Sequence, residues 1–154
     1  MRVPLALAIA ASVLALAATA PPDARAQIDL PDTPAGRRAA EMLRLTVEGD
    51  DAARRALVAE GFSPSLRDAF RIEEHLRIQA EMQRRSGGYD AVEVRDSDPF
   101  AIQVLVRARN GGELRMLTLR TETEPPHRIA GMGMRPLTPA DGVEAPDVPE
   151  RVLP

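Results

Sequence analysis

Glu73 and Arg77 are the two residues of this sequence whose types and spacing most suggest a chemical role. They stand four residues apart in a segment with helical periodicity, and both fall inside the apolar arc of that predicted helix. A carboxylate held among apolar groups can act as a general base. The structural alternative, which is the more common, is an i,i+4 ion pair at the edge of the core.

Tyr89 and His127 are the other candidates. Tyr89 opens a predicted strand and Asp90 beside it points to the opposite face, so packing explains this Tyr better than proton donation. His127 follows two prolines at the start of another predicted strand, and the sequence supplies no partner for a general base. His75 is predicted to lie opposite the apolar arc, in solvent. We assign no catalytic residue, and the candidate ligand-binding residues are Glu73, Arg77, Tyr89 and His127.

Composition excludes several classes of chemistry. The chain has no Cys and no Lys, which rules out disulfides, thiol catalysis, Schiff bases and a Walker-type phosphate loop. Its two His have no neighbouring ligands at metal-binding spacing, and we predict no metal or other cofactor. The net charge is −3, Arg residues alternate with Asp and Glu, and aromatic residues make up 3% of the chain. These features argue against nucleic-acid binding.

Residues 1–26 predict a cleavable secretory signal peptide, and therefore an exported protein, periplasmic or extracellular. Arg2 supplies the positive charge, and residues 3–19 are uncharged and rich in Leu and Ala. Small residues suit cleavage after Ala20 or after Ala26, and the second is favoured because Pro21 directly follows the first. The alternative is a retained membrane anchor, although the segment is barely long enough to span. After cleavage we expect no stable membrane insertion.

Three helices are predicted after the leader, over residues 34–47, 51–61 and 64–85. Thr33-Pro34 and Ser63-Pro64 each combine an N-cap with proline at the first helical position, and Asp50 caps the second helix. Gly87-Gly88 ends the third helix, which is the longest.

Alternating hydrophobicity then predicts four antiparallel strands, over residues 89–96, 100–109, 113–122 and 127–134. Asp98-Pro99, Asn110-Gly111-Gly112 and Pro125-Pro126 mark the turns between them. We expect an α+β fold in which three N-terminal helices precede a curved four-stranded antiparallel meander that wraps the long third helix. The domain spans residues 27–136, and the proline-rich residues 137–154 form an irregular or disordered tail.

Two stretches, together with this order of elements, resemble the nuclear-transport-factor-2-like (cystatin-like cone) family. One is Pro31-Asp32-Thr33-Pro34-Ala35-Gly36, which opens a helix ending at Glu48-Gly49-Asp50; the other is PPHRIAGMGMRP, residues 125–136. The sequence resembles the exported domains that precede bacterial serine-hydrolase or tail-specific-peptidase domains. The resemblance implies the cone fold of ketosteroid isomerases and polyketide cyclases, with Glu73 and Arg77 at the mouth where members bind ligands. No hydrolase domain follows here, so hydrolase activity is not implied.

Apolar residues on both faces of the predicted sheet indicate that something packs on its second face. If Val104 faces the helix, then Ala101 and Leu105 face outward. Leu117, Ala130 and Met132 are expected to join them.

We therefore predict an exported, non-enzymatic binding or interaction domain that self-associates through its sheet. Its partner is a second copy, in a homodimer, or another exported protein, and a small apolar ligand is a further candidate. The alternative is a small cone-fold isomerase, cyclase or hydrolase, with Glu73 as base and Arg77 or Tyr89 as polarising group.

Overall fold

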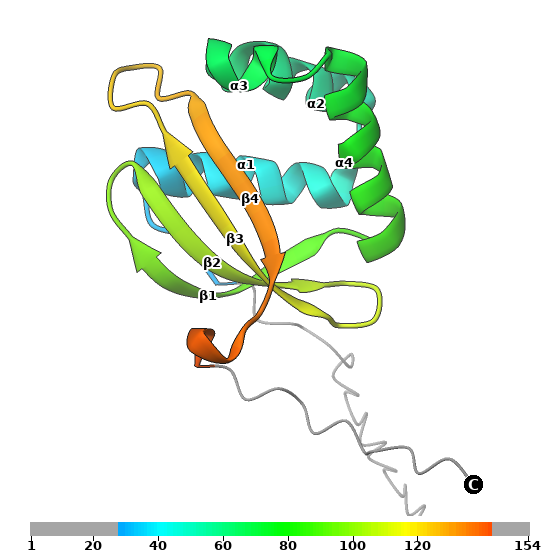
Figure 1. Cartoon of the computed structure of the whole chain (residues 1–154), viewed down its shortest axis with the longest axis vertical. Helices are drawn as coiled ribbons and strands as arrows, with labels where there is room; N and C mark the ends of the chain where they lie inside the picture. The colour runs from blue at the N-terminus through cyan, green and yellow to red at the C-terminus, as the bar shows by residue number, and fades with distance from the viewer. Residues whose placement is uncertain (1–27, 143–154) are drawn as a thin grey trace, which may run out of the picture.

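The computed structural model describes residues 28–142, so the predicted signal peptide and most of the predicted tail lie outside the described residues. The helices are α1 (Pro34–Glu48), α2 (Asp51–Ala56), the π-helical turn η1 (Leu57–Gly61), α3 (Pro64–Asp68) and α4 (Ile72–Ser86). The strands are β1 (Tyr89–Ser97), β2 (Ala101–Ala108), β3 (Leu114–Thr121) and β4 (Ile129–Pro136), followed by the 3₁₀ turn η2 (Pro139–Asp141). They form one antiparallel sheet in the order β1-β2-β3-β4 (Figure 1), which confirms the predicted α+β class and meander.

Cross-strand pairing separates the two faces of the sheet. On the inner face Val104 pairs with Leu117, and Leu117 pairs with Met134. On the outer face Leu105 pairs with Met116. The prediction that Leu117 and Met132 face outward is wrong, because this register places Leu117 in the core with 1% of its surface exposed and pairs Met132 with the buried Leu119. Leu105 does lie on the outer face, but it is buried, with 4% exposed.

The helix that packs against the inner face is α1. Ala35 and Ala39 have no exposed surface, and small side chains at these positions let the helix backbone approach the strands closely. The backbone N–H of Ala35 also donates to the carbonyl oxygen of Pro99, in the turn between β1 and β2 (3.1 Å). The sheet therefore curves around the first helix, and not around the predicted third helix.

The predicted third helix is in fact two helices, α3 and α4, separated at Ala69–Arg71. His75, at the start of α4, holds the break in place. Its ring lies edge-on to the rings of Phe62 and Phe70, each 5.5 Å away, and its Nε2 is 3.1 Å from the carbonyl oxygen of Arg67 in α3. His75 is 7% exposed, so the prediction that it lies in solvent is wrong. The break changes the phase of the helix, and the apolar arc drawn through an unbroken segment no longer applies.

Side chains cap three of the helices as predicted. The hydroxyl of Thr33 accepts from the backbone N–H of Gly36 (3.0 Å), a carboxylate oxygen of Asp50 accepts from Ala52 (2.7 Å), and the hydroxyl of Ser63 accepts from Leu66 (3.3 Å). Helix α4 is different, because Arg71 at its N-cap makes no side-chain capping bond.

The first residues of the predicted tail are not irregular. Thr138 and Asp141 form a capping box around η2, and Asp141 pairs with Arg135 at the end of β4 (2.6 Å). This turn fixes the chain to the last strand as far as Gly142. Within residues 28–142, no helix is both long enough and apolar enough to cross a membrane.

Candidate functional site

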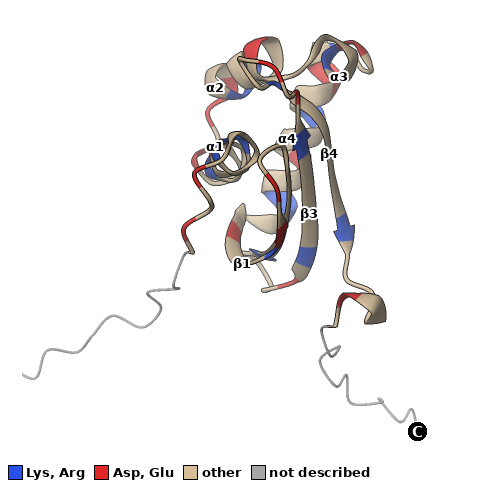
Figure 2. Ribbon diagram, turned by 90° about the vertical axis from the view of Figure 1, so that its left-hand side faces the viewer, with Lys and Arg blue, Asp and Glu red and all other residues tan. Residues whose placement is uncertain are grey.

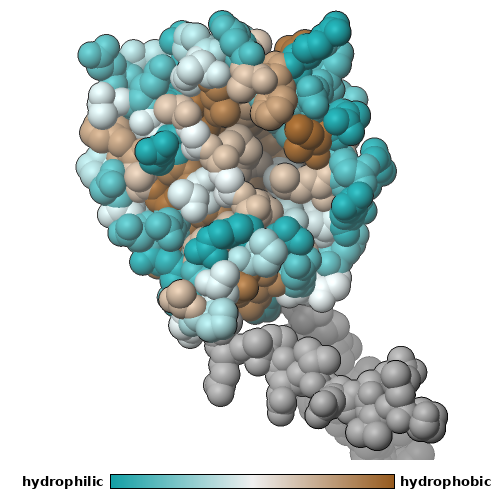
Figure 3. Space-filling model, viewed as in Figure 1, coloured by the Kyte–Doolittle hydropathy of each residue, from teal (hydrophilic) through white to brown (hydrophobic). Residues whose placement is uncertain are grey.

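A cavity of about 230 Å³ lies between the helices and the half of the sheet formed by β3 and β4. On the face where β4 and α4 lie, apolar side chains gather around a hollow (Figure 3). Among large apolar residues, Met132 on β4 and Ile78 on α4 are exposed, at 36% and 41%. The cavity is lined by Met42, Leu45 and Thr46 of α1, Arg54 of α2, Leu57 of η1, Gln79 and Met82 of α4, Leu117 of β3, and Met132, Gly133 and Met134 of β4.

Methionine is concentrated in this wall. The chain has six Met, of which one is Met1, and four of the remaining five line the cavity. Thioether side chains are unbranched and polarisable, so they adapt to an irregular ligand. The cavity therefore has a deformable apolar surface, unlike the close-packed contact between α1 and the strands. These four residues are Met42, Met82, Met132 and Met134.

Arg54 is the one charged residue among those that line the cavity. Its side chain is 4% exposed. Nη1 donates to a carboxylate oxygen of Asp51 (3.0 Å), whose own side chain is 85% exposed. Nη2 donates to Oε1 of Gln83, and Nε2 of Gln83 donates in turn to the carbonyl oxygen of Val47 (3.2 Å). The guanidinium is thus held where α2, α4 and the end of α1 meet.

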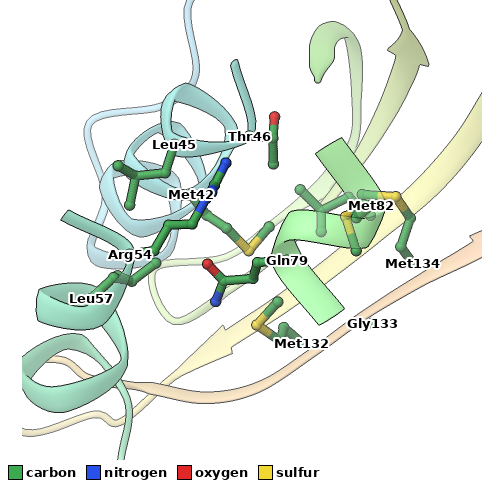
Figure 4. A pocket seen from close by; sticks show the side chains of 11 residues that line it. Met42, Leu45, Thr46, Arg54, Leu57, Gln79, Met82, Met132, Gly133 and Met134 are labelled. Carbon is green, nitrogen blue, oxygen red and sulfur yellow. The ribbon is translucent and has the colours of Figure 1, made fainter. Parts of the chain in front are cut away.

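Polar and apolar parts of the wall lie at different ends of the cavity. Figure 4 shows the amide of Gln79 turned toward α2, the helix that carries Arg54, whereas Met132 and Met134 lie on the side of β4. The remaining polar residue, Thr46, is already satisfied. Its hydroxyl donates to the carbonyl oxygen of Leu43 (2.7 Å) and accepts from the backbone N–H of Tyr89 (3.1 Å). Arg54 and Gln79 are therefore the polar groups with capacity to bind a ligand.

Glu73 and Arg77 do not line this cavity. The carboxylate of Glu73, 68% exposed, lies 4.0 Å from the guanidinium of Arg71, and Arg77, 72% exposed, pairs with Glu74 at 3.6 Å. The expected placement of both side chains among apolar groups is wrong, because the break before α4 turns them outward. They line a shallow surface hollow with Arg71 and Glu74. The enzyme alternative gains no support from this arrangement.

Tyr89 and His127 also lie outside the cavity. Tyr89 opens β1 as predicted, and its side chain belongs to the core with 7% exposed. His127 precedes β4 in a left-handed conformation (φ 54°), with its ring 5.7 Å from that of Phe100 and its Nδ1 3.2 Å from the carbonyl oxygen of Glu122. Both positions are those of residues that pack or hold a turn. Glu73 and Arg77 share only the shallow hollow on α4, and neither Tyr89 nor His127 joins them there.

Sequence reasoning missed Arg54 and the methionines. Arg54 stands three residues before Leu57 and four before Val58, which places a cation on the buried face of its helix. Met132 and Met134 alternate along β4, so both point to one side of the sheet. These signals are local, and no local pattern shows that Met42 and Met132, 90 residues apart, line the same cavity.

The strongest electrostatic feature lies at the end of β4, outside the cavity. The Arg135 guanidinium, followed by the backbone N–H and the hydroxyl of Thr138, holds the pKa of Asp141 well below its usual range. The same contact with Asp141 raises the pKa of Arg135. Among the described residues no group of three acidic or His side chains is placed to hold a metal ion.

No family model matches the chain, and comparisons with curated proteins and with solved structures found no match.

Proposed function

We propose that this protein is an exported, non-enzymatic binding domain that holds a small apolar ligand in the cavity between α1, α4 and β4. The observation that carries the proposal is the wall of that cavity, where four methionines and three leucines surround about 230 Å³. Ligand sites are concave and mostly apolar, with a few polar groups that orient the ligand. The volume lies below the usual range of about 300–1,000 Å³ for drug-sized ligands, which favours a single short chain or a small ring.

The proposal includes a cone-like fold of the nuclear-transport-factor-2-like kind and export of the protein. A cone-like architecture of the nuclear-transport-factor-2-like kind would place a ligand between the helices and the concave face of the sheet. The helices that precede an antiparallel meander, and the curvature of the sheet around α1, support it (Figure 1). Export rests on the composition of residues 1–26.

Titration of the purified protein with octanol tests ligand binding. We expect chemical-shift changes in the methyl groups of Met82 and Met132 at sub-millimolar octanol. Met82→Phe puts a larger, stiffer side chain into the wall and is expected to weaken binding roughly tenfold, a change of about 1.4 kcal/mol. Ile78→Phe is the matched control, because Ile78 lies on the same helix, is exposed and does not line the cavity. Binding that is absent in the wild type, or equally strong in both variants, contradicts the proposal.

Self-association is a second candidate function, and the edge of β4 favours it. Among the described residues β4 pairs with β3 on one side, and its other side has only an isolated bridge, from Phe62 to Ile129. Residues 129–134 carry no charge, and the ribbon of β4 is uncoloured along this stretch (Figure 2). The opposite edge, β1, has two bulges and four charged residues, which are devices that prevent edge pairing. An uncharged edge can pair with its own copy across a twofold axis without bringing like charges together.

Light scattering during size-exclusion chromatography tests this second candidate. We expect a dimer that Ala130→Lys converts to a monomer, because Ala130 is exposed on β4 and lies outside the cavity wall. Thr123→Lys, in the loop before β4, is the control and is expected to leave the dimer intact. A wild-type monomer at high concentration would exclude pairing through β4.

A further inference from the structure

Arg54 places a positive charge at one end of a cavity whose other end is apolar. A guanidinium withdrawn from water is unfavourable unless an anion and hydrogen-bond acceptors compensate it. Arg54 is 4% exposed, while the carboxylate of its ionic partner, Asp51, is 85% exposed and so is strongly screened by solvent. Its other partner, Gln83, is neutral. The buried positive charge is therefore only partly balanced by the protein.

The guanidinium also has donors to spare. Arginine carries five N–H groups, and the hydrogen bonds of Arg54 with described residues go to one oxygen of Asp51 and one of Gln83. Gln83 is itself fixed by its bond to the carbonyl oxygen of Val47, so the plane of the guanidinium is held before any ligand arrives. A fork of this kind matches the two oxygens of a carboxylate.

The rest of the wall fits the tail of such a ligand. Away from Arg54 and Gln79, the lining consists of thioether and aliphatic side chains, the backbone of Gly133, and Thr46, whose hydroxyl is hydrogen-bonded within the protein (Figure 4). One guanidinium balances one negative charge, whereas a phosphate monoester carries about 1.5 to 2 charges near neutral pH and would keep an unpaired charge in an apolar site. The small volume favours a single short chain.

We propose that the cavity takes a short-chain or medium-chain carboxylate, with the carboxylate on Arg54 and the alkyl tail among the methionines. This inference rests on the proposed function, since it names the ligand class of the same cavity. Arg54 then has two roles, because it joins α2 to α4 through Gln83 and offers its remaining donors to the ligand. The apolar wall supplies affinity, and the cation selects an anionic head over a neutral one.

Parallel titrations with octanoate and octanol, probes of equal chain length, test the inference. We expect octanoate to bind the wild type roughly tenfold more tightly than octanol. Arg54→Gln is expected to abolish this preference, so that octanoate binds no more tightly than octanol. Arg55→Gln is the matched control, because Arg55 is the exposed neighbour on the same helix and does not line the cavity.

A measurement on the wild type keeps the test independent of the stability of Arg54→Gln. The Nε–Hε resonance of Arg54 is expected to shift on addition of octanoate and not on addition of octanol. If both probes bind equally and this resonance does not move, the carboxylate inference is wrong and the apolar binding site stands. If neither probe binds, the proposed function itself is wrong.

Discussion

Helices α1 and α4 are alike in length and differ in how they meet the rest of the domain. Each has 15 residues and ends at a glycine in the left-handed conformation, with φ of 60° at Gly49 and 69° at Gly87. Six residues of α1 are buried, compared with two of α4, His75 and Ser86. Helix α1 contacts β1, β2 and β3, whereas α4 packs mainly against α1 and α2. Helix α1 covers the inner face of the sheet, whereas α4 lies beside α1 and borders the cavity.

The difference follows from side-chain size along each helix. Alanines on α1 allow close contact with valines of β2, and interiors packed in this way have no room for a ligand. Helix α4 presents Gln79 and Met82 to the cavity, where they line the space between the helices and the sheet. A domain can thus divide its inner face into a part that provides stability and a part that provides space. Four experiments test this division.

The largest expected effect comes from truncating matched aliphatic residues on the two helices. Leu43→Ala on α1 removes a side chain that is 5% exposed and should lower the free energy of unfolding by about 2–5 kcal/mol. Ile78→Ala on α4, at 41% exposed, should change it by no more than about 0.5 kcal/mol. Urea denaturation followed by circular dichroism measures both, and similar losses would mean that α4 is as much a part of the core as α1.

Removing the N-cap of α1 comes next. Thr33→Ala deletes the hydroxyl that accepts from the backbone N–H of Gly36, and we expect a loss of about 1 kcal/mol. Thermal unfolding measures it, with Thr123→Ala in an exposed loop as the control. An unchanged midpoint would show that the contacts of α1 with the sheet hold its first turn without the cap.

The reverse change at α4 should be stabilising by a smaller amount. Arg71 is in an extended conformation at the N-cap, and Glu74 stands three residues after it. Arg71→Ser creates a capping box with Glu74 at the cost of a weak ion pair to Glu73, and we expect a gain of about 0.5–1 kcal/mol. Arg71→Ala, which cannot cap, is the control. Equal stability of the two variants would argue that the start of α4 is fixed by His75 alone.

The smallest expected effect is the loss of local stability at η2 when the pH is lowered. Because its pKa is lowered in the folded state, ionised Asp141 stabilises η2 at neutral pH, and this contribution is lost as the pH falls below the ordinary carboxyl range. We expect the amide of Thr138 to lose protection from hydrogen exchange in strong acid before the amides of α1 do. Asp141→Asn should remove this pH dependence, and Asp68→Asn, at an exposed ion pair, should not. Simultaneous loss of protection in both regions would show that the end of β4 and the core unfold together.

Local chemistry made much of the fold predictable. Thr33, Asp50 and Ser63 were identifiable as caps because a short polar side chain before a helix has few other roles. Asn110-Gly111-Gly112 marked the hairpin between β2 and β3, since both glycines adopt positive φ there. The break before α4 had no such signal. Neither Gly nor Pro lies between Pro64 and Ser86, and the break depends on His75 packing against Phe62, a tertiary contact.

The cavity was less predictable than the fold. Glu73 and Arg77 were chosen because an unbroken helix would have turned them inward, so an error in one element became an error in the site. The bulges in β1 also interrupt the alternation expected of a strand, because Val94 pairs with Val104 on the inner face while Val92 falls within a register shift. The position of Arg54 on an apolar helix face is unusual for a cation and could be noticed in the sequence. Its place in the cavity wall depends on the packing of α2 against α4, which the sequence pattern does not show.

The methionine wall also determines how the domain responds to oxidants. A thioether is converted to a sulfoxide, which is polar and larger, and the chain has no Cys to react first. Met132 is the lining residue at the surface, with 36% exposed, whereas Met42 is 6% exposed. An oxidant therefore reaches the cavity from the β4 side and adds a dipole where an alkyl tail would lie. Met42, on α1, is buried in the core, so oxidation at Met132 is expected to weaken binding of an apolar ligand before it affects the packing of α1 on the sheet.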